Sequence, residues 1–209
     1  MISIKITQIE NGPFSENAWI ISDTDSRDAI LIDPGDESKR IAGIIEDNRL
    51  NLQFILATHG HLDHIGAVCD LTNKFNVPFM IHMRDESMVK DLPKVQKMFG
   101  LPESEVPIIS GYVSDQEKII MGGVNINVIE TPGHTQGGVC FLVEGHLFSG
   151  DTLFSGSIGR TDLPGGDYSV LISSIKQKLI SLPDDTIVHS GHGPDTMIGI
   201  ERQQNPFLQ

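Results

Sequence analysis

The spacing of apolar residues along the chain alternates between the short period of a strand and the longer period of a helix. Short apolar or alternating runs predict strands over residues 2–9, 18–22, 29–35, 52–58, 77–82, 124–131 and 185–191. Apolar residues three or four positions apart predict helices over residues 37–49, 65–75 and 168–182, and one or two helices broken at Pro93 over residues 84–99. A hairpin turning at Glu144-Gly145 is predicted over residues 138–151, and a short helix with a frayed end over the tail 196–209.

Both halves of the chain follow the same order of strands, helix, strand and helix. Each predicted helix has one apolar stripe and each strand has at least one apolar face, so the elements need to pack in layers. Two sheets packed on each other, with helices on the outside, would bury all of these faces. The sequence therefore predicts an α+β fold, and a length of 209 residues is consistent with a single domain over residues 1–209.

Composition and charge narrow the class of protein. Hydrophobic residues make up 39% of the chain, and 28 acidic against 15 basic side chains give a formal net charge of −13, which disfavours nucleic acids and anionic membranes as partners. The apolar runs are shorter than the roughly 20 residues of a membrane span, and the first residues lack the pattern of a signal peptide. With only two cysteines, Cys69 and Cys140, we expect a cytoplasmic protein without a disulfide framework.

Candidate metal ligands are concentrated directly after the strand predicted over residues 52–58. The segment THGHLDHIG, residues 58–66, places four of them close together: His59, His61, Asp63 and His64. Imidazole and carboxylate groups are ligands that zinc, iron and manganese accept. Two histidines two positions apart on an extended loop can bind one ion, and the following turn can direct Asp63 and His64 toward a second ion.

Three other predicted strands also end in a possible ligand. These ligands are His134 after INVIETPG, Asp151 after HLFSG and His192 after TIVHSG. If the four strand ends meet at one sheet edge, they bring together five histidines and two aspartates. Seven such ligands suit two ions that share a bridging carboxylate. A structural zinc site is disfavoured, because such sites are usually rich in cysteine.

These residues make the chain resemble the metallo-β-lactamase-fold hydrolases. The H-x-H-x-D-H motif of that family stands here as residues 59–64, and the early Asp33-Pro34-Gly35 also matches a family motif. The resemblance implies a four-layer αββα sandwich. It also implies that His59, His61 and His134 bind one ion, that Asp63, His64 and His192 bind the other, and that Asp151 bridges them. Zinc is the expected metal, and iron and manganese are the other candidates.

Within this family, the motifs after residue 130 are most similar to short glyoxalase II-like proteins. They are TPGHTQGG (131–138), SGDTLF (149–154), GSIGRTDLPGGD (156–167) and SGHGP (190–194). The chain ends at Gln209 without the helical extension of full-length glyoxalase II, and its loop 156–167 differs from the version there. We therefore expect weaker binding of glutathione thioesters. The Gly-Arg-Thr-Asp loop also resembles that of persulfide dioxygenases, which bind a single iron.

Three hypotheses for function remain open. The first is a thioester hydrolase acting on substrates such as S-lactoylglutathione, with a metal-bridged hydroxide as nucleophile, because a thiolate leaves without help from an acid. Asp63 would bind one metal and orient the hydroxide. The second is a mononuclear iron persulfide dioxygenase that uses His59, His134 and Asp151, and the third is a non-enzymatic metal-binding scaffold.

The residues around the metal motif support further expectations. The net positive charge of two ions with their ligands favours a small anionic thioester as substrate, and Arg160 is a candidate to bind it. Asp33 is a candidate to orient a ligand imidazole. His82, His146 and His189 are interpreted as turn or strand-end residues, and the two cysteines as small core residues. The oligomeric state is not predicted.

Overall fold

The structure, a computed structural model, describes residues 3–209; the strand predicted from residue 2 therefore begins outside the described residues. Its first sheet has the strand order β1-β2-β3-β4-β5-β6. The strands are β1 (Ile4–Asn11), β2 (Glu16–Asp23), β3 (Asp28–Ile32), β4 (Asn51–Leu56), β5 (Phe79–His82) and β6 (Gly111–Val113). The first three are antiparallel, and the strands from β3 to β6 are parallel.

The second sheet has the order β14-β13-β10-β9-β8-β7. Its strands are β7 (Lys118–Met121), β8 (Val124–Glu130), β9 (Val139–Val143), β10 (His146–Gly150), β13 (Ile187–Ser190) and β14 (Thr196–Met197). A small hairpin of β11 (Leu153–Phe154) and β12 (Ser157–Ile158) follows β10. The predicted turn between β9 and β10 is confirmed, because Glu144 and Gly145 both have positive φ.

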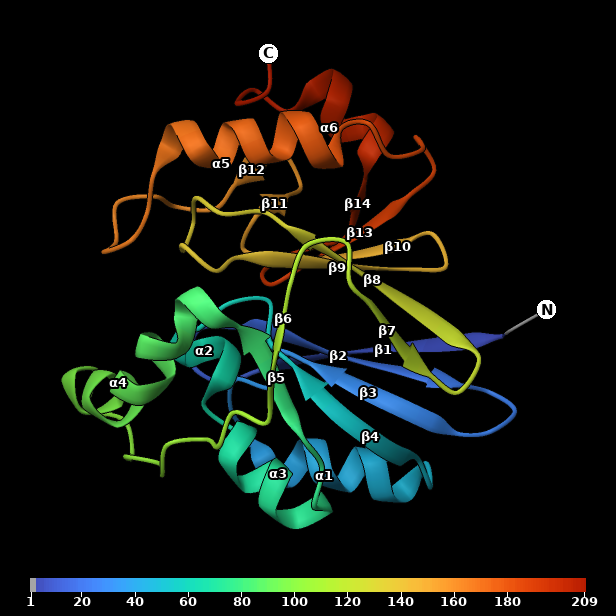
Figure 1. Cartoon of the computed structure of the whole chain (residues 1–209), viewed down its shortest axis with the longest axis vertical. Coiled ribbons are helices and arrows are strands. Elements are labelled where there is room, and N and C mark those ends of the chain that lie inside the picture. Colours follow the sequence, from blue (N-terminus) through green and yellow to red (C-terminus); the bar gives the residue numbers. More distant parts are fainter. Residues whose placement is uncertain (1–2) are drawn as a thin grey trace.

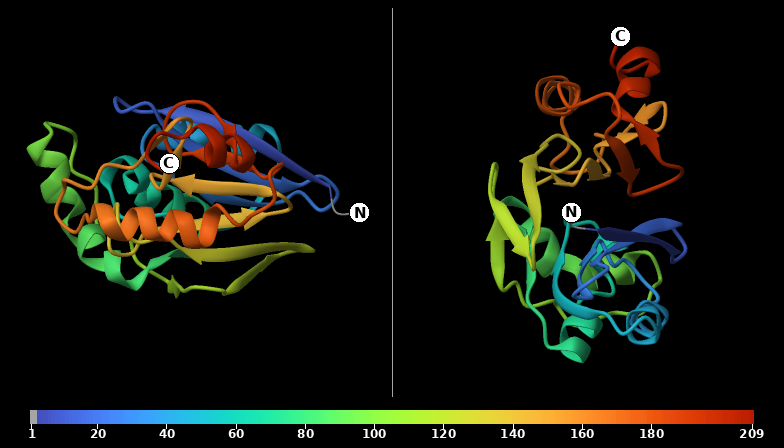
Figure 2. Two further views of the ribbon diagram at one scale, coloured as in Figure 1. Left: turned by 90° about the horizontal axis from the view of Figure 1, so that it is seen from above. Right: turned by 90° about the vertical axis from the view of Figure 1, so that its right-hand side faces the viewer.

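Helices cover the outer face of each sheet (Figures 1 and 2). On the first sheet these are α1 (Ser38–Asp47), α2 (Leu62–Ile65), α3 (Val68–Phe75) and α4 (Glu86–Met98), and on the second α5 (Tyr168–Ser174) and α6 (Ile198–Gln204). The predicted four-layer αββα sandwich is therefore confirmed. Among the described residues, no helix is long and apolar enough to cross a membrane.

Three apolar cores separate the four layers. Alternation along the central strands explains how they form: Ile20 and Leu31 face the helices of the first sheet, while Ile21 and Ile30 face the second sheet. A third core packs the second sheet against the last two helices, and Cys140 lies fully buried within it. Each sheet is thus apolar on both faces, so its loops and strand ends are left to carry polar chemistry.

The helix predicted over residues 65–75 is confirmed over Val68–Phe75, but it is interrupted at residues 66 and 67. The chain forms α2, then turns at Gly66-Ala67 before α3 begins. Gly66 packs against the carbonyl oxygen of Gly35, where a side chain would overlap with it, and the amide of Ala67 donates to the carbonyl of Pro34 at 3.0 Å. This contact between the two turns sets the direction of α2, which carries two of the candidate ligands.

Two predicted helices differ in detail. Pro93 does not break α4, because buried Val89 and Leu92 hold the helix to the core on the residues just before the proline. The helix predicted over 168–182 has a π-helical turn, Ile175–Leu179, after α5. Leu171, Ile175 and Leu179 lie four residues apart and are all fully buried, and the wider turn keeps them on one face. The strands β6, β7, β11, β12 and β14 were not predicted; four of them, β6, β11, β12 and β14, have only two or three residues, too few for a periodic signal.

Candidate metal centre

The candidate ligands lie at the carboxyl ends of four strands, as predicted, and the structure brings all seven side chains together. Four follow β4, which belongs to the first sheet, and the others follow β8, β10 and β13 of the second sheet. The two halves meet here through the backbone: the amide of Val139 donates to the carbonyl of Thr58 at 2.8 Å, and Asn17 donates to the carbonyl of Gly191 at 2.8 Å. The site therefore lies where both sheets end.

His59, His61 and His134 form the first cluster. The Nε2 atom of His134 lies 3.2 Å from Nε2 of His59 and 2.9 Å from Nδ1 of His61. His59 and His134 are almost completely buried, and His61 is half-buried. Three ring nitrogens that face one another at such distances repel if all present lone pairs, so this geometry fits a cation between them.

Asp63, His64 and His192 form the second cluster. The Oδ2 atom of Asp63 lies 3.3 Å from Nε2 of His192 and 3.9 Å from Nε2 of His64. His64 is fully buried, and its Nε2 atom has no hydrogen-bond partner in the described chain. A buried nitrogen left without a partner is costly, and a metal ion at this cluster would satisfy it.

Asp151 lies between the two clusters. Its Oδ2 atom is 3.5 Å from Nε2 of His134, whereas Oδ1 is 3.4 Å from Nε2 of His64 and 3.7 Å from Nε2 of His192. Oδ1 is buried and has no hydrogen-bond partner among residues 3–209. One carboxylate thus presents a different oxygen to each cluster, which is the arrangement that a bridging ligand requires.

Hydrogen bonds behind three histidines fix which ring nitrogen faces the clusters. Asp33 accepts from Nδ1 of His64 at 3.0 Å, and the carbonyl of Arg160 accepts from Nδ1 of His134 at 2.7 Å. The hydroxyl of Thr58 donates to Asp33 at 2.6 Å and lies 3.1 Å from Nδ1 of His59, which can therefore donate to it. Each ring gives its proton to a fixed acceptor and turns Nε2 toward the site, as in metal centres.

Comparison with known proteins places this geometry in a family. The sequence model of the metallo-beta-lactamase superfamily matches residues 11–192. The chain belongs to the metallo-β-lactamase superfamily. Hydroxyacylglutathione hydrolase GloC of Haemophilus influenzae is 42% identical over 199 residues, which are 93% of this chain and 93% of that protein.

Two solved structures are also similar over nearly the whole chain. The BLEG-1 B3 metallo-beta-lactamase has a TM-score of 0.92 at 37% identity, covering 98% of this chain and 100% of that one. TTHA1623 in a di-iron-bound form has a TM-score of 0.89 at 36% identity, covering 97% of this chain and 100% of that one. The resemblance seen in the sequence is confirmed: the chain is a metallo-hydrolase of the metallo-β-lactamase superfamily.

Burial and neighbouring charges give the histidines of this superfamily member opposite pKa shifts in the metal-free chain. Burial lowers the pKa of His59 well below its ordinary value and that of His61 to about 4. Burial also opposes a charge on His64, but the carboxylates of Asp151 and Asp33 outweigh it and raise its pKa well above the ordinary value. His59 and His61 are therefore neutral at pH 7, whereas His64 holds a proton.

The pKa values of the two site carboxylates, Asp63 and Asp151, are both lowered. Burial alone would raise the pKa of Asp63 and of Asp151, but imidazole neighbours reverse the sign. The hydrogen bond from His192 lowers the pKa of Asp63, and the charge of His64 lowers the pKa of Asp151. Both carboxylates are thus ionised and ready to bind a cation across the neutral pH range.

Sequence reasoning missed Asp85, which braces the loops of the first cluster. Its carboxylate, 1% exposed, accepts from the amide of Gly60 at 3.0 Å, from the hydroxyl of Thr135 at 2.7 Å and from the amide of Gly137 at 2.7 Å. These loops carry His59, His61 and His134. A positional signal was available, because only Met83 and Arg84 separate Asp85 from the strand predicted over residues 77–82.

The remaining candidates lie outside the two clusters. The guanidinium of Arg160 is exposed and forms two bonds of 2.7 Å to Asp162, so its backbone carbonyl, not its side chain, contacts a candidate ligand. Asp33 holds His64 as expected, and its positive φ of 53° turns the chain there. The other three histidines belong to strands: His82 ends β5, His146 begins β10 and His189 lies within β13.

Proposed function

We propose that this metallo-hydrolase cleaves acyl thioesters, S-lactoylglutathione among them, with two divalent ions. In this proposal His59, His61 and His134 hold one ion and Asp63, His64 and His192 the other, with Asp151 between them. The observation that carries it is the position of Asp151, whose two oxygens face different clusters at 3.4 to 3.7 Å. The di-iron form of TTHA1623, 36% identical, supports two ions. Zinc is our proposed metal, and iron or manganese would suit the same ligands.

Two ions bound there would supply a water nucleophile at neutral pH and polarise the carbonyl oxygen of the substrate. Asp63 would also orient the attacking water by accepting a hydrogen bond from it at its carboxylate. The acceptors behind His59, His64 and His134 keep the three rings from rotating, so the ligand set does not reorganise during turnover.

A thioester suits this site because its leaving group needs little assistance. A thiol has a pKa near 8.5, so the thiolate can depart without a proton donor, whereas the amine from an amide cannot. The relative named hydroxyacylglutathione hydrolase supports the same substrate class. The small anionic substrate expected from the sequence remains part of the proposal, with Arg160 held in place by Asp162 as its cation. Two buried free cysteines suit the cytoplasm as the compartment.

Steady-state hydrolysis of S-lactoylglutathione by the metal-loaded chain tests this function. We expect thiol release that requires metal, a loss of about a hundredfold in kcat for Asp63→Asn, and mainly a higher KM for Arg160→Ala. Asp185→Asn, an exposed change in the second half, is the matched control. Oxygen uptake on glutathione persulfide without any thioester hydrolysis would replace the proposal with the dioxygenase.

A further inference from the structure

His192 is held in its cluster differently from His59, His64 and His134. Each of those three rings has an acceptor at its Nδ1 atom. The Nε2 atom of His192 faces the second cluster, but within residues 3–209 no hydrogen bond holds its Nδ1 atom. The position of this ring therefore depends on the backbone that carries it, residues 190–193, which we call the His192 loop.

Every backbone carbonyl of the His192 loop accepts a hydrogen bond, and most of the donors belong to Asn17. The Nδ2 atom of Asn17 donates to the carbonyl of Ser190 at 3.1 Å and to that of Gly193 at 3.0 Å. The backbone amide of Asn17 donates to the carbonyl of Gly191 at 2.8 Å. The hydroxyl of Ser190 donates to the remaining carbonyl, that of His192, at 2.7 Å. One residue of the first sheet thus binds the loop at three points.

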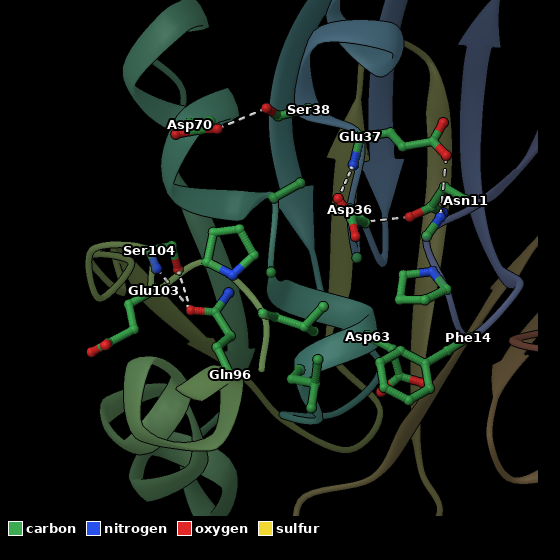
Figure 3. Close-up of a pocket in the computed structure, with 18 residues that line it drawn as sticks. Asn11, Phe14, Asp36, Glu37, Ser38, Asp63, Asp70, Gln96, Glu103 and Ser104 are labelled. Atoms are coloured by element: carbon green, nitrogen blue, oxygen red, sulfur yellow. Dashed lines mark hydrogen bonds between the residues drawn. The ribbon is translucent and has the colours of Figure 1, made fainter. Parts of the chain in front are cut away.

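Asn17 is itself fixed near the start of β2. It is 1% exposed, and its Oδ1 atom accepts from Nε2 of Gln8 on β1 at 2.9 Å, so its NH2 group is turned toward the His192 loop. Asn11, which lines the pocket in Figure 3, accepts from the amide of Asp36 at 2.7 Å and donates to the carbonyl of Glu16 at 3.1 Å. The backbone next to Asn17 is therefore anchored to the first sheet before it meets the loop.

The second cluster is sensitive to the position of this loop because its ligands come from both halves of the chain. Asp63 and His64 follow β4 of the first sheet, whereas His192 follows β13 of the second. Gly191 lies so close to the cluster that a Cβ atom there would be 2.5 Å from Oδ1 of Asp151 and 2.7 Å from Cε1 of His64. A small shift of the loop would therefore change the distance of 3.3 Å between Oδ2 of Asp63 and Nε2 of His192.

We propose that Asn17 is a positioning residue for the second metal ion: its side chain holds the His192 loop at the distance from Asp63 and His64 that one ion requires. The inference rests on the two-ion site of the proposed function and adds the group that sets the geometry of the second cluster. Asparagine suits this role because one NH2 group offers two protons to two carbonyls. Without it those carbonyls lose their donor and the loop can move away from α2, which weakens the second ion and leaves the first cluster intact.

Zinc titration of the full-length Asn17→Ala variant tests this role. The free zinc concentration is set with a competing chelator, and binding is followed by NMR of the histidine ring nitrogens. We expect the signals of His64 and His192 to need about tenfold more free zinc than in the native chain, and those of His59 and His61 to change by less than about twofold. An unchanged second cluster, or equal weakening of both clusters, would overturn the proposal.

Asn205→Ala is the matched control, because Asn205 is also buried and its Nδ2 atom also donates to two oxygens. These are the carbonyl of Ser157 at 3.0 Å and the carboxylate of Glu201 at 2.7 Å. We expect this variant to lose thermal stability without a change in either zinc affinity; selective weakening of the second cluster here too would refute the assignment to Asn17. If Asn17→Ala does not fold, Asn17→Ser carries the same test, with a smaller increase because its hydroxyl keeps one donor.

Turnover separates this inference from the proposed function. On S-lactoylglutathione at limiting zinc, we expect Asn17→Ala to lose about tenfold in kcat with little change in KM, and excess zinc to restore kcat. If zinc affinity changes as expected but the native chain cleaves no thioester, the reaction is wrong and the role of Asn17 holds. If the native chain cleaves thioesters and Asn17→Ala binds both ions normally, only this inference fails. A native chain in which zinc shifts neither His64 nor His192 would overturn both the second ion and this inference.

Discussion

At the scale of single residues, Asp151 links the two clusters, and its loss should affect both. In Asp151→Ala each cluster keeps only three ligands, and two cations would repel across a gap without the carboxylate between them. We expect the metal content to fall from about two ions per chain to below one, and kcat/KM to fall at least about a hundredfold. Elemental analysis measures this, with Asp185→Ala as control. Two retained ions would show that Asp151 is not the bridge.

Asp85 touches neither a substrate nor a candidate ligand, yet it should matter as a positioning residue. Asp85→Ala would leave the buried amides of Gly60 and Gly137 without acceptors, which costs about 1–3 kcal/mol each. We expect lower stability in denaturant and weaker binding of the ion at the first cluster. Asp91→Ala, an exposed change on α4, is the control. Similar unfolding midpoints for the two variants would contradict this role.

At the scale of elements, the contact between the turn at Pro34-Gly35 and the turn at Gly66-Ala67 controls where α2 lies. A side chain at Gly35 would overlap with the backbone carbonyl of Asp63, whereas a side chain at Gly43, inside α1, would meet nothing within 4 Å. We therefore expect Gly35→Ala to destabilise the fold by about 2 kcal/mol or more and to weaken the second cluster. Gly43→Ala should instead stabilise by about 0.5–1 kcal/mol, because alanine favours the helix.

Thermal unfolding of both glycine variants checks this pair, since the two substitutions add the same methyl group. A stability of Gly35→Ala equal to that of the native chain would mean that the turn can shift without cost. Destabilisation by Gly43→Ala would contradict the open space seen around that residue.

Periodicity predicted the long elements, and its failures have physical causes. Strands such as β2 and helices such as α1 bury a regular face, so their sequences carry the pattern. The break at Gly66 depends on the carbonyl of Gly35, which is distant in sequence, and Pro93 stays helical because its neighbours are buried. Contacts between distant segments decided these cases.

The candidate ligands were predictable for a related reason. Each stands in the loop or short helix that follows a buried strand, and strand ends of stacked sheets meet at one edge, so the sequence pattern alone brings them near one another. The groups that orient them were only partly predictable. Asp33 lies in a recognisable turn, but the acceptor for His134 is a backbone carbonyl, which every residue has. Asp85 joins the site only through the fold.

At the scale of the whole molecule, the clusters join the two halves of the chain. His59 to His64 come from the first sheet and the other ligands from the second, so bound ions hold the two sheets together at this edge. Ions that bind only the folded chain stabilise it by about 4 kcal/mol at a thousandfold excess over Kd. We expect chelation to lower the Tm by about 10 °C. Calorimetry of the chain with and without chelator measures this, and an unchanged Tm would argue against metal ions as a link between the halves.

The link that bound ions form between the two sheets should weaken stepwise as the pH falls. In the metal-free chain the pKa of His64 is raised by Asp151 and Asp33 against the effect of burial, and the hydrogen bond to Asp63 likewise raises the pKa of His192. A metal ion at the second cluster must displace these protons, so its affinity rises with pH and is lost as pH falls. His61, with a pKa of about 4, stays neutral through this range.

We therefore expect the ion of the second cluster to leave first when the pH is lowered from 7 toward 5, while the first cluster keeps its ion. Metal content after dialysis at each pH gives the order of loss. Titration calorimetry at pH 7, in buffers of different ionisation enthalpy, should detect proton release for one of the two binding events and little for the other. Loss of both ions at one pH, or equal proton release for both, would mean that the two clusters act as a single unit through Asp151.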